Sequence, residues 1–195
     1  MSSKIDIRII KTQRTIYKVF FELMNEIGFS KMSVQNIIDR AEINRSTFYA
    51  HFVDKFDLLN KAENNLLDGL KNISQDGYDK AISKGILTED VLQVHINHLC
   101  KYFHDNGRDF TLLISDKGDP AFTSKISDLI KFSWTQLRFS KLSVPQNYAS
   151  AALMGMITSL MVEWVKSGFR ETQEEFAKIC YKIVKDIPSS IFVLN

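Results

Sequence analysis

Residues that interrupt helices are scarce in this chain of 195 residues, and no proline comes before Pro120. The whole chain holds only 3 Pro and 8 Gly. Sandwiches and barrels built from many short strands need frequent turns, and those turns use glycine and proline. Apolar residues at helical spacing fill the long stretches between the few breaks. The sequence therefore predicts an all-α fold made of long helices.

The composition is that of a folded globular protein, with 45% hydrophobic and 25% charged residues. The first residues mix charges with apolar side chains, unlike the unbroken apolar core of a secretory signal. The most apolar stretch, 149–165, is shorter than a membrane span and contains Glu163. Cys100 and Cys180 are too few for a disulfide framework or a closed zinc site. We expect a cytoplasmic protein without a membrane span, with both thiols reduced.

Positive charge is concentrated at the N-terminal end. Residues 1–62 carry ten Lys/Arg against seven Asp/Glu, although the net charge of the whole chain is only +2. This difference fits a phosphate-facing head on a neutral body. It also fits ordinary scatter, so the charge needs a motif to support it.

Two helices are predicted before residue 42. The first runs roughly over 9–27 and is followed by Gly28, a residue typical of the position after a helix end. Phe29 is then placed to fold back on the last turn. In the second, Ser33 is a good N-cap, and apolar residues follow at i, i+3, i+4 and i+7. These apolar residues are Val34, Ile37, Ile38 and Ala41.

A third, very short helix is predicted to begin at Arg45, with Asn44 as its N-cap. Phe48 and Phe52 lie four residues apart and share one side, whereas Arg45, Ser46 and Tyr49 fall on another. A fourth helix follows, capped by Asp54, with Asp57 at the partner position. Because two helical turns do not persist alone in water, the two phenyl rings must anchor this helix. Its polar side is then free to enter a DNA major groove.

The segment SVQNIIDRAEINRSTFYAHFVDKFDLL, residues 33–59, resembles the helix-turn-helix of the TetR family of bacterial transcriptional regulators. STFYAHF followed by DK and a leucine-containing helix is its most specific part. The resemblance implies a DNA-binding domain over 8–68 and a helical regulatory and dimerisation domain over 69–195. The sequence departs from the family at Glu42, often glycine, and at Asn44, often serine; both departures bear on operator preference.

The resemblance implies a set of DNA contacts. Gln35, Arg45 and Ser46 match base-reading positions, where arginine suits guanine and glutamine suits adenine. Thr47, Tyr49 and His51 match positions that touch phosphate. Lys55, at the start of the fourth helix, and Ser33 are further phosphate candidates. For Gln35 a purely solvated role remains open, and His51 is equally well explained as a histidine at the rim of the core.

The body is expected to hold helices near 88–105, 121–139, 147–168 and 172–187. The segments DKGDPAFTSKI (116–126) and WVKSGFRETQEEFA (164–177) resemble one subgroup of TetR-like C-terminal domains. The helix from Tyr148 to Val165 is apolar on nearly every face, so it must be covered on all sides. A second stripe follows it: Phe176, Ile179, Cys180, Ile183, Val184 and Ile187. In the family the last two helices form the dimer interface, which implies a homodimer through about 147–187.

The residues of the body suggest two kinds of small-ligand site. An apolar cavity for a small apolar or amphipathic effector is one, although such aromatic residues are more often simply core. The candidate lining residues are Phe103, Phe110, Phe122, Phe132, Phe139, Trp134 and Trp164. A metal site is the other, but no acidic partner accompanies its candidates His95, His98, Cys100 and His104. We expect no metal and no cofactor.

No phosphate-cradling glycine-rich loop, H-E-x-x-H or G-x-S-x-G motif is present, so we expect no enzyme. The favoured interpretation is a repressor that responds to a ligand and binds a pseudo-palindromic operator in double-stranded DNA as a dimer. The alternative is a TetR-like co-regulator or activator acting mainly through protein–protein contacts. Arg45, Tyr49 and Lys55 favour the first, because a protein docked only to other proteins has no need of them.

Overall fold

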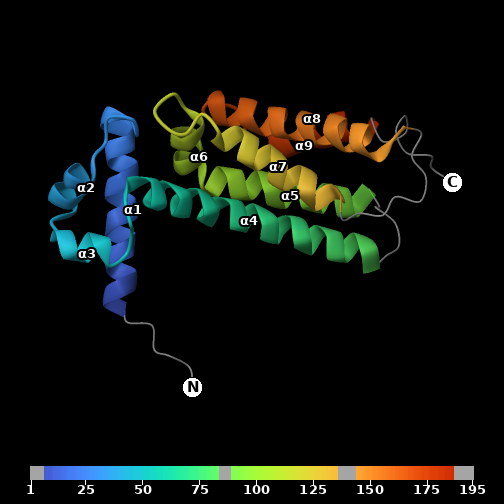
Figure 1. Ribbon diagram of the computed structural model, residues 1–195. Coiled ribbons are helices and arrows are strands. Elements are labelled where there is room, and N and C mark those ends of the chain that lie inside the picture. The colour runs from blue at the N-terminus through green and yellow to red at the C-terminus, as the bar shows by residue number, and fades with distance from the viewer. Residues whose placement is uncertain (1–6, 84–88, 136–143, 187–195) are drawn as a thin grey trace, which may run out of the picture. The chain divides into compact units, whose positions relative to one another are not determined.

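A computed structural model describes residues 7–83, 89–135 and 144–186, and within these ranges the regular structure is helical (Figure 1). No strand occurs among the residues so described, and the predicted all-α fold is confirmed. The helices are α1 (Ile7–Ile27), α2 (Val34–Ala41), α3 (Arg45–Tyr49), α4 (Lys55–Ser83), α5 (Glu89–Asp105), α6 (Gly107–Ile114), α7 (Phe122–Thr135), α8 (Gln146–Lys166) and α9 (Gln173–Asp186).

The chain divides into two compact units. The N-terminal unit comprises Met1–Asn65 together with Leu112–Pro120, and the C-terminal unit comprises Leu66–Thr111 together with Ala121–Asn195. Helix α4 is continuous through the boundary between them. The segment from 112 to 120 therefore belongs with the first unit, although the sequence alone groups it with the body.

A cluster of phenyl rings and aliphatic side chains forms the core of the N-terminal unit. Phe20 of α1 is fully buried, as is Phe48 of α3, and Phe29 packs edge-on against Phe20 with ring centroids 6.2 Å apart. The other most deeply buried members are Ile16, Met24, Ile37, Phe52 and Leu58. Burial of this apolar surface holds together helices that are too short to be stable alone.

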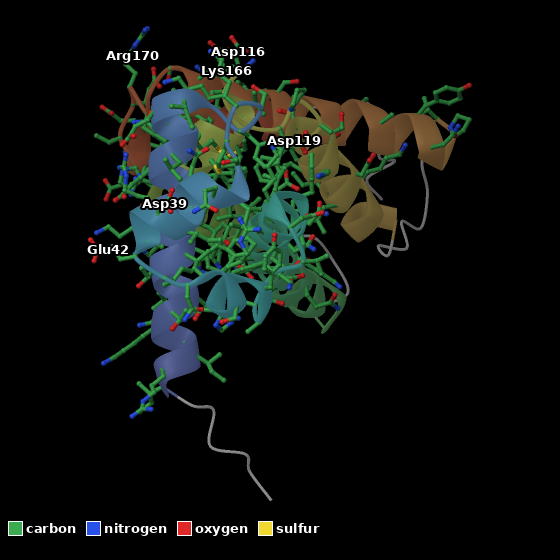
Figure 2. All side chains as sticks on the ribbon, turned by 60° about the vertical axis from the view of Figure 1, so that its left-hand side comes forward. Asp39, Glu42, Asp116, Asp119, Lys166 and Arg170 are labelled. Atoms are coloured by element: carbon green, nitrogen blue, oxygen red, sulfur yellow. The ribbon has the colours of Figure 1, made fainter. Side chains whose placement is uncertain are left out.

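Two left-handed residues end the first two helices. Gly28 has φ 79° after α1, as its predicted role requires. Glu42, labelled in Figure 2, has φ 52° at the end of α2, and its N–H donates to the carbonyls of Ile38 and Asp39. A side chain in this conformation costs about 1–2 kcal/mol, which explains physically why glycine suits this turn.

The segment 112–120 begins in the last turn of α6, a helix that the sequence did not predict. Helix α6 lies in the stretch between the expected helices, and the following loop packs on the end of α1. The Phe29 N–H donates to the Lys117 carbonyl at 2.8 Å, and the Lys117 ammonium donates to the Asn25 carbonyl. A Cβ added to Gly118 would collide with the carbonyl oxygens of Leu112 and Leu113, so this loop closes tightly only with glycine.

In the C-terminal unit α5 packs along α9, and α7 packs along α8 (Figure 1). Phe103 stacks on Phe110 at 4.3 Å, and Trp164 stacks on Phe176 at 4.2 Å. Cys100 and Cys180 are buried as free thiols. A hydrogen bond to Cys180 and burial both raise the pKa of Cys100, so it stays an unreactive thiol.

The observed body helices agree with the expected ranges to within a few residues wherever the structure describes them. Residue 88 of the first expected body helix, residues 136–139 of the second, which include Phe139, and residue 187 of the last lie outside the described residues. No described helix is long and apolar enough to cross a membrane. Among the residues described, no three His, Cys, Asp or Glu side chains gather into a metal-binding group.

Candidate nucleic-acid interface

Helix α3 has one buried side and one open side. Phe48 is fully buried and Phe52 is 1% exposed, with the two ring centroids 5.7 Å apart. Tyr17 of α1 meets Phe52 edge-on at 5.7 Å. Arg45 and Ser46 are exposed on the other side, and Tyr49 is 48% exposed. The phenyl rings thus anchor this helix from behind and leave its polar side accessible.

Asn44 organises the first turn of α3. Its Oδ1 accepts hydrogen bonds from the Thr47 N–H and from the hydroxyls of Ser46 and Thr47, each at 2.7 Å. The predicted N-cap is confirmed. Both hydroxyls donate to Asn44, which fixes the positions of the Ser46 and Thr47 side chains. Their oxygen atoms can still accept hydrogen bonds.

Ser33 caps α2 in the same way. Its hydroxyl accepts from the Asn36 N–H at 3.1 Å and donates to Asn36 Oδ1 at 2.7 Å, while its own N–H donates to that oxygen at 2.9 Å. This reciprocal arrangement is a capping box with asparagine at the third position. Ser33 is exposed, but its hydroxyl is committed to the cap.

The structure brings two predicted base-reading residues together. The Arg45 guanidinium donates to Gln35 Oε1 at 2.8 Å, across the turn between α2 and α3. The Gln35 amide in turn donates to Asp39 Oδ1 at 2.6 Å. All three side chains are exposed. Asp39 was missed from the sequence, although its place one helical turn after Gln35 was a usable signal.

The ammonium of Lys55 is bonded within the protein, whereas a lysine that contacts phosphate would extend into solvent. The Lys55 ammonium donates to the backbone carbonyls of Phe29, Ser30 and Met32 at 3.1, 3.3 and 2.7 Å. It also lies 4.7 Å from the centre of the Phe29 ring. An ammonium has three hydrogens, and three carbonyls of the loop between α1 and α2 lie within hydrogen-bond distance of it. Lys55 therefore holds that loop in place.

The N-terminus of α4 is satisfied by its own side chains. Asp54 Oδ1 accepts from the N–H groups of Phe56 and Asp57, both at 2.8 Å. The Asp57 carboxylate accepts from the Val53 N–H at 2.9 Å and from the Lys61 ammonium at 3.0 Å, and these contacts hold the pKa of Asp57 below its usual range. These carboxylates therefore already supply the negative charge that the N-terminus of α4 would otherwise attract from a phosphate.

His51 lies half-buried at the edge of the same region. Its ring is 6.2 Å from that of Phe52, and its carbonyl accepts from the Lys61 ammonium at 3.0 Å. Lys61 therefore links the end of α3 to α4, a role that was not predicted from the sequence. The spacing of four residues from Asp57 to Lys61 was the available signal.

The candidate effector residues are packed within the C-terminal unit. Phe103, Phe110, Phe122 and Trp164 are each at most 1% exposed. Phe110 lies 6.1 Å from Phe122 and stacks on Phe103, so these rings fill the core, in line with the alternative that such residues are simply core. The side chains of Phe132 and Trp134 lie outside the described part, although their backbone belongs to α7.

Comparisons with known proteins agree with this geometry. A family model described as bacterial regulatory proteins, tetR family, matches residues 13–62. A second, described as a transcriptional regulator C-terminal region, matches residues 90–186. The two models cover the helix-turn-helix and the helical body in turn. No curated protein matches the sequence.

Solved structures extend the similarity over nearly the whole chain. A TetR transcriptional regulator from Streptococcus agalactiae is 26% identical over 92% of this chain and 96% of its own, with a TM-score of 0.66. A putative TetR-family regulator from Syntrophomonas wolfei is 18% identical over 95% and 99%, with the same TM-score. NalD from Pseudomonas aeruginosa, the secondary repressor of a multidrug efflux pump, is 18% identical over 94% and 96%, with a TM-score of 0.62.

The anchored recognition helix, the two consecutive family matches and the structural similarity along the chain lead to one conclusion. This chain belongs to the TetR family of bacterial regulatory proteins, a family without enzymatic activity, and is a DNA-binding transcriptional regulator.

Proposed function

We propose that the protein is a ligand-responsive repressor that binds a pseudo-palindromic operator as a homodimer. The observation that carries this proposal is the two-sided build of α3, with Phe48 fully buried and Arg45, Ser46 and Tyr49 exposed. A helix of this size fits the DNA major groove, and its N-terminal residues reach base edges.

The proposed contacts divide by chemistry. Arg45 reads a base edge, helped by Gln35 and Ser46. Tyr49 is exposed and suited to donate to a phosphate, as is the imidazole of His51. Thr47 and Ser33 donate to a phosphate only by turning their hydroxyls away from Asn44 and Asn36. Lys55 contributes its positive charge and, through three carbonyls, the position of the loop before α2.

Selection of bound sequences from random duplex DNA tests this proposal. Two recognition helices of a dimer read half-sites one helical turn apart, about 34–36 Å, so the selected sequences should form an inverted repeat. Affinity should fall steeply as salt rises, because each phosphate contact releases counterions. A protein that selects no sequence in dilute buffer is not the operator-binding regulator proposed.

Dimerisation through α8 and α9 is supported by the surfaces these helices leave open. Ile179 and Ile183 of α9 are 42% and 38% exposed, although Phe176 and Cys180 on the same helix are buried. On α8 the exposed side carries Tyr148 and four small residues: Ala151, Ala152, Gly155 and Ser159. Small residues allow close helix approach, and a second copy would cover this apolar face.

Gly155→Arg tests the interface with little risk to the fold. A Cβ added at Gly155 meets nothing within 4 Å, so a single subunit accommodates the side chain. A charged side chain inside a helix–helix interface should leave a monomer at micromolar concentration, measured by sedimentation. Glu174→Arg, at an exposed position of α9, is the control and should remain a dimer.

The C-terminal unit is where we place the effector. Thr158 of α8 is 5% exposed, and its hydroxyl has no hydrogen-bond partner among the described residues. A buried hydroxyl without a partner costs free energy, which a polar group on an otherwise apolar effector would recover. Helix α4 is continuous through both units, so a change in its course reaches the DNA-binding helices.

Coupling between effector and operator is expected to be about 1–3 kcal/mol, or roughly 5–150-fold in affinity. Titrating the operator complex with small apolar and amphipathic molecules should identify compounds that release the DNA. Because coupling is reciprocal, the operator must weaken binding of such a compound by the same factor.

A second candidate is an activator or co-regulator that works mainly through protein contacts. One similar structure, 18% identical with a TM-score of 0.63, is a dihydroxyacetone kinase operon activator, DhaS. A reporter gene placed under the selected operator separates the two outputs. Repression lowers transcription when the protein is present, whereas activation raises it.

A further inference from the structure

Three exposed side chains on α2 and α3 form a continuous hydrogen-bonded chain. The Asp39 carboxylate accepts from the Gln35 amide at 2.6 Å, and the Gln35 amide oxygen accepts from the Arg45 guanidinium at 2.8 Å. Figure 2 shows Asp39 on α2. We infer that these residues act as one unit, in which Arg45 reads a guanine and Gln35 and Asp39 position it. This inference rests on the operator binding proposed above.

The amide of Gln35 is oriented by its two partners. Only the carbonyl oxygen can accept from Arg45, and only the NH₂ group can donate to Asp39. Asp39 therefore fixes which end of the amide faces the guanidinium. An adenine reader would offer both ends of this amide to the base, so the arrangement favours a positioning role for Gln35.

Holding the Arg45 side chain in place before DNA binds reduces the entropy cost of binding. Its side chain has about 2 kcal/mol of rotamer entropy, part of which is lost whenever the guanidinium takes one position on a base. Holding one terminal nitrogen on Gln35 removes part of this loss before DNA arrives. The guanidinium has five N–H donors, so enough remain for O6 and N7 of guanine.

Competing partners near the unit are already engaged. The arginine of α2, Arg40, forms a two-pronged bond to Glu26 of α1 at 3.0 and 2.8 Å. It is therefore not the partner of Asp39. Asn44, next to Arg45, is committed to the cap of α3. Neither of these side chains therefore competes with Gln35 for the Asp39 carboxylate.

In water this chain of exposed bonds adds little stability, because solvent competes for every group. In the groove that competition falls, and a negative charge at Asp39 also opposes phosphate. Asp39 thus lowers general affinity for DNA while it sharpens the choice of base. Specificity gained by a repulsive group is a common design in recognition surfaces.

The test measures base preference with the full-length protein. Its operator is first selected from random duplexes, and affinity is then measured for all four base pairs at each position. Arg45→Ala should abolish the preference for one G·C pair in each half-site, about 5–150-fold in the wild type. Gln35→Ala should reduce the preference at that same base pair by about 2–10-fold, the range of one lost hydrogen bond.

Two further variants separate positioning from reading. Gln35→Glu keeps an acceptor for Arg45 but loses the N–H that Asp39 accepts, so it should retain most of the guanine preference and lose about as much as Asp39→Ala. Asp39→Ala should reduce it by about 2-fold, whereas Glu42→Ala, which removes the same charge from the end of α2, should leave it unchanged. Thermal unfolding verifies that each variant is folded.

The outcomes are distinct. If Gln35→Ala changes preference at a different base pair and leaves that of Arg45 intact, Gln35 is a reader and the inference fails. It also fails if Asp39→Ala and Glu42→Ala act alike. If the wild type selects no sequence at all, the proposed operator binding itself fails, and the inference with it.

Discussion

Helices α3 and α8 are held in place by different means. α3 has five residues, a side-chain cap from Asn44 and one fully buried ring, Phe48. α8 has 21 residues, follows Pro145 without a side-chain cap, and exposes apolar residues such as Tyr148. The short helix depends on a cap from the residue before it and on the packing of its buried ring. The long one depends on packing, part of which a single subunit does not supply.

Phe48→Ala should have the largest effect. The ring is fully buried, and removing a buried phenyl group costs about 3–5 kcal/mol. Because α3 cannot persist alone, this loss should release the helix and abolish DNA binding together with stability. Chemical denaturation measures the change, and Val53→Ala, at a residue 76% exposed, is the control with little expected effect. A stable Phe48→Ala protein that still binds operator would show that α3 is held by something other than this ring.

Lys55→Met should rank second. The variant keeps the length of the side chain but loses the ammonium that bonds three loop carbonyls, at about 1.5–3 kcal/mol for a hydrogen bond to a charged group. Lys31→Met, at an exposed lysine in the same loop, should change stability by less than about 0.5 kcal/mol. Denaturant titration compares the two.

The salt dependence of operator binding decides between the two roles for Lys55. A lysine bonded to phosphate would reduce the salt slope by about one when removed, at unchanged stability. A lysine that holds the loop changes stability first. If Lys55→Met is as stable as the wild type and loses one unit of slope, the ammonium leaves its carbonyls for DNA.

Asn44→Ala and Thr158→Val should have effects of similar size and opposite sign. Asn44 satisfies three donors at the start of α3, and losing an N-cap costs about 1 kcal/mol. The Thr158 hydroxyl on α8 is buried without a described partner, so valine should raise stability by about 1 kcal/mol. Thermal and denaturant unfolding at fixed protein concentration measure both. A destabilised Thr158→Val would mean that the hydroxyl is bonded after all.

The sequence was most informative where structure is set locally. Ser33, Asn44 and Gly28 were predicted in their capping roles because caps depend on residues within one turn. The side of α3 that Phe48 occupies followed from the helical period. Helix α6 was missed because its eight residues carry only a short apolar stripe, although Asn106 directly before it and Asp109 in its first turn were usable signals. The partners of the candidate DNA-binding residues could not be predicted, since Lys55 bonds residues 23–26 positions away in the chain.

Asp57→Asn should produce the smallest effect, and one that depends on pH. The Val53 N–H and the Lys61 ammonium lower the pKa of the Asp57 carboxylate in the folded protein. Between this value and the higher pKa of the unfolded chain, about 3.9, the unfolded state binds more protons, so stability falls as the pH is lowered. At neutral pH the free energy of unfolding of the wild type should exceed that of Asp57→Asn by less than about 1 kcal/mol, as expected for an exposed ion pair.

This difference should disappear below the folded-state pKa, where the wild-type carboxyl is also neutral. Lys61→Met and the double variant complete a cycle that isolates the ion pair, which lies 3.0 Å apart, from the hydrogen bond that the substituted amide could still accept from the Val53 N–H. A gap that persists unchanged in acid would show that the ion pair with Lys61 is not its cause. In that case the N-terminus of α4 depends on the hydrogen bonds that Asp54 and Asp57 accept, as α3 depends on those that Asn44 accepts, and the contrast with α8 rests on caps and not on an ion pair.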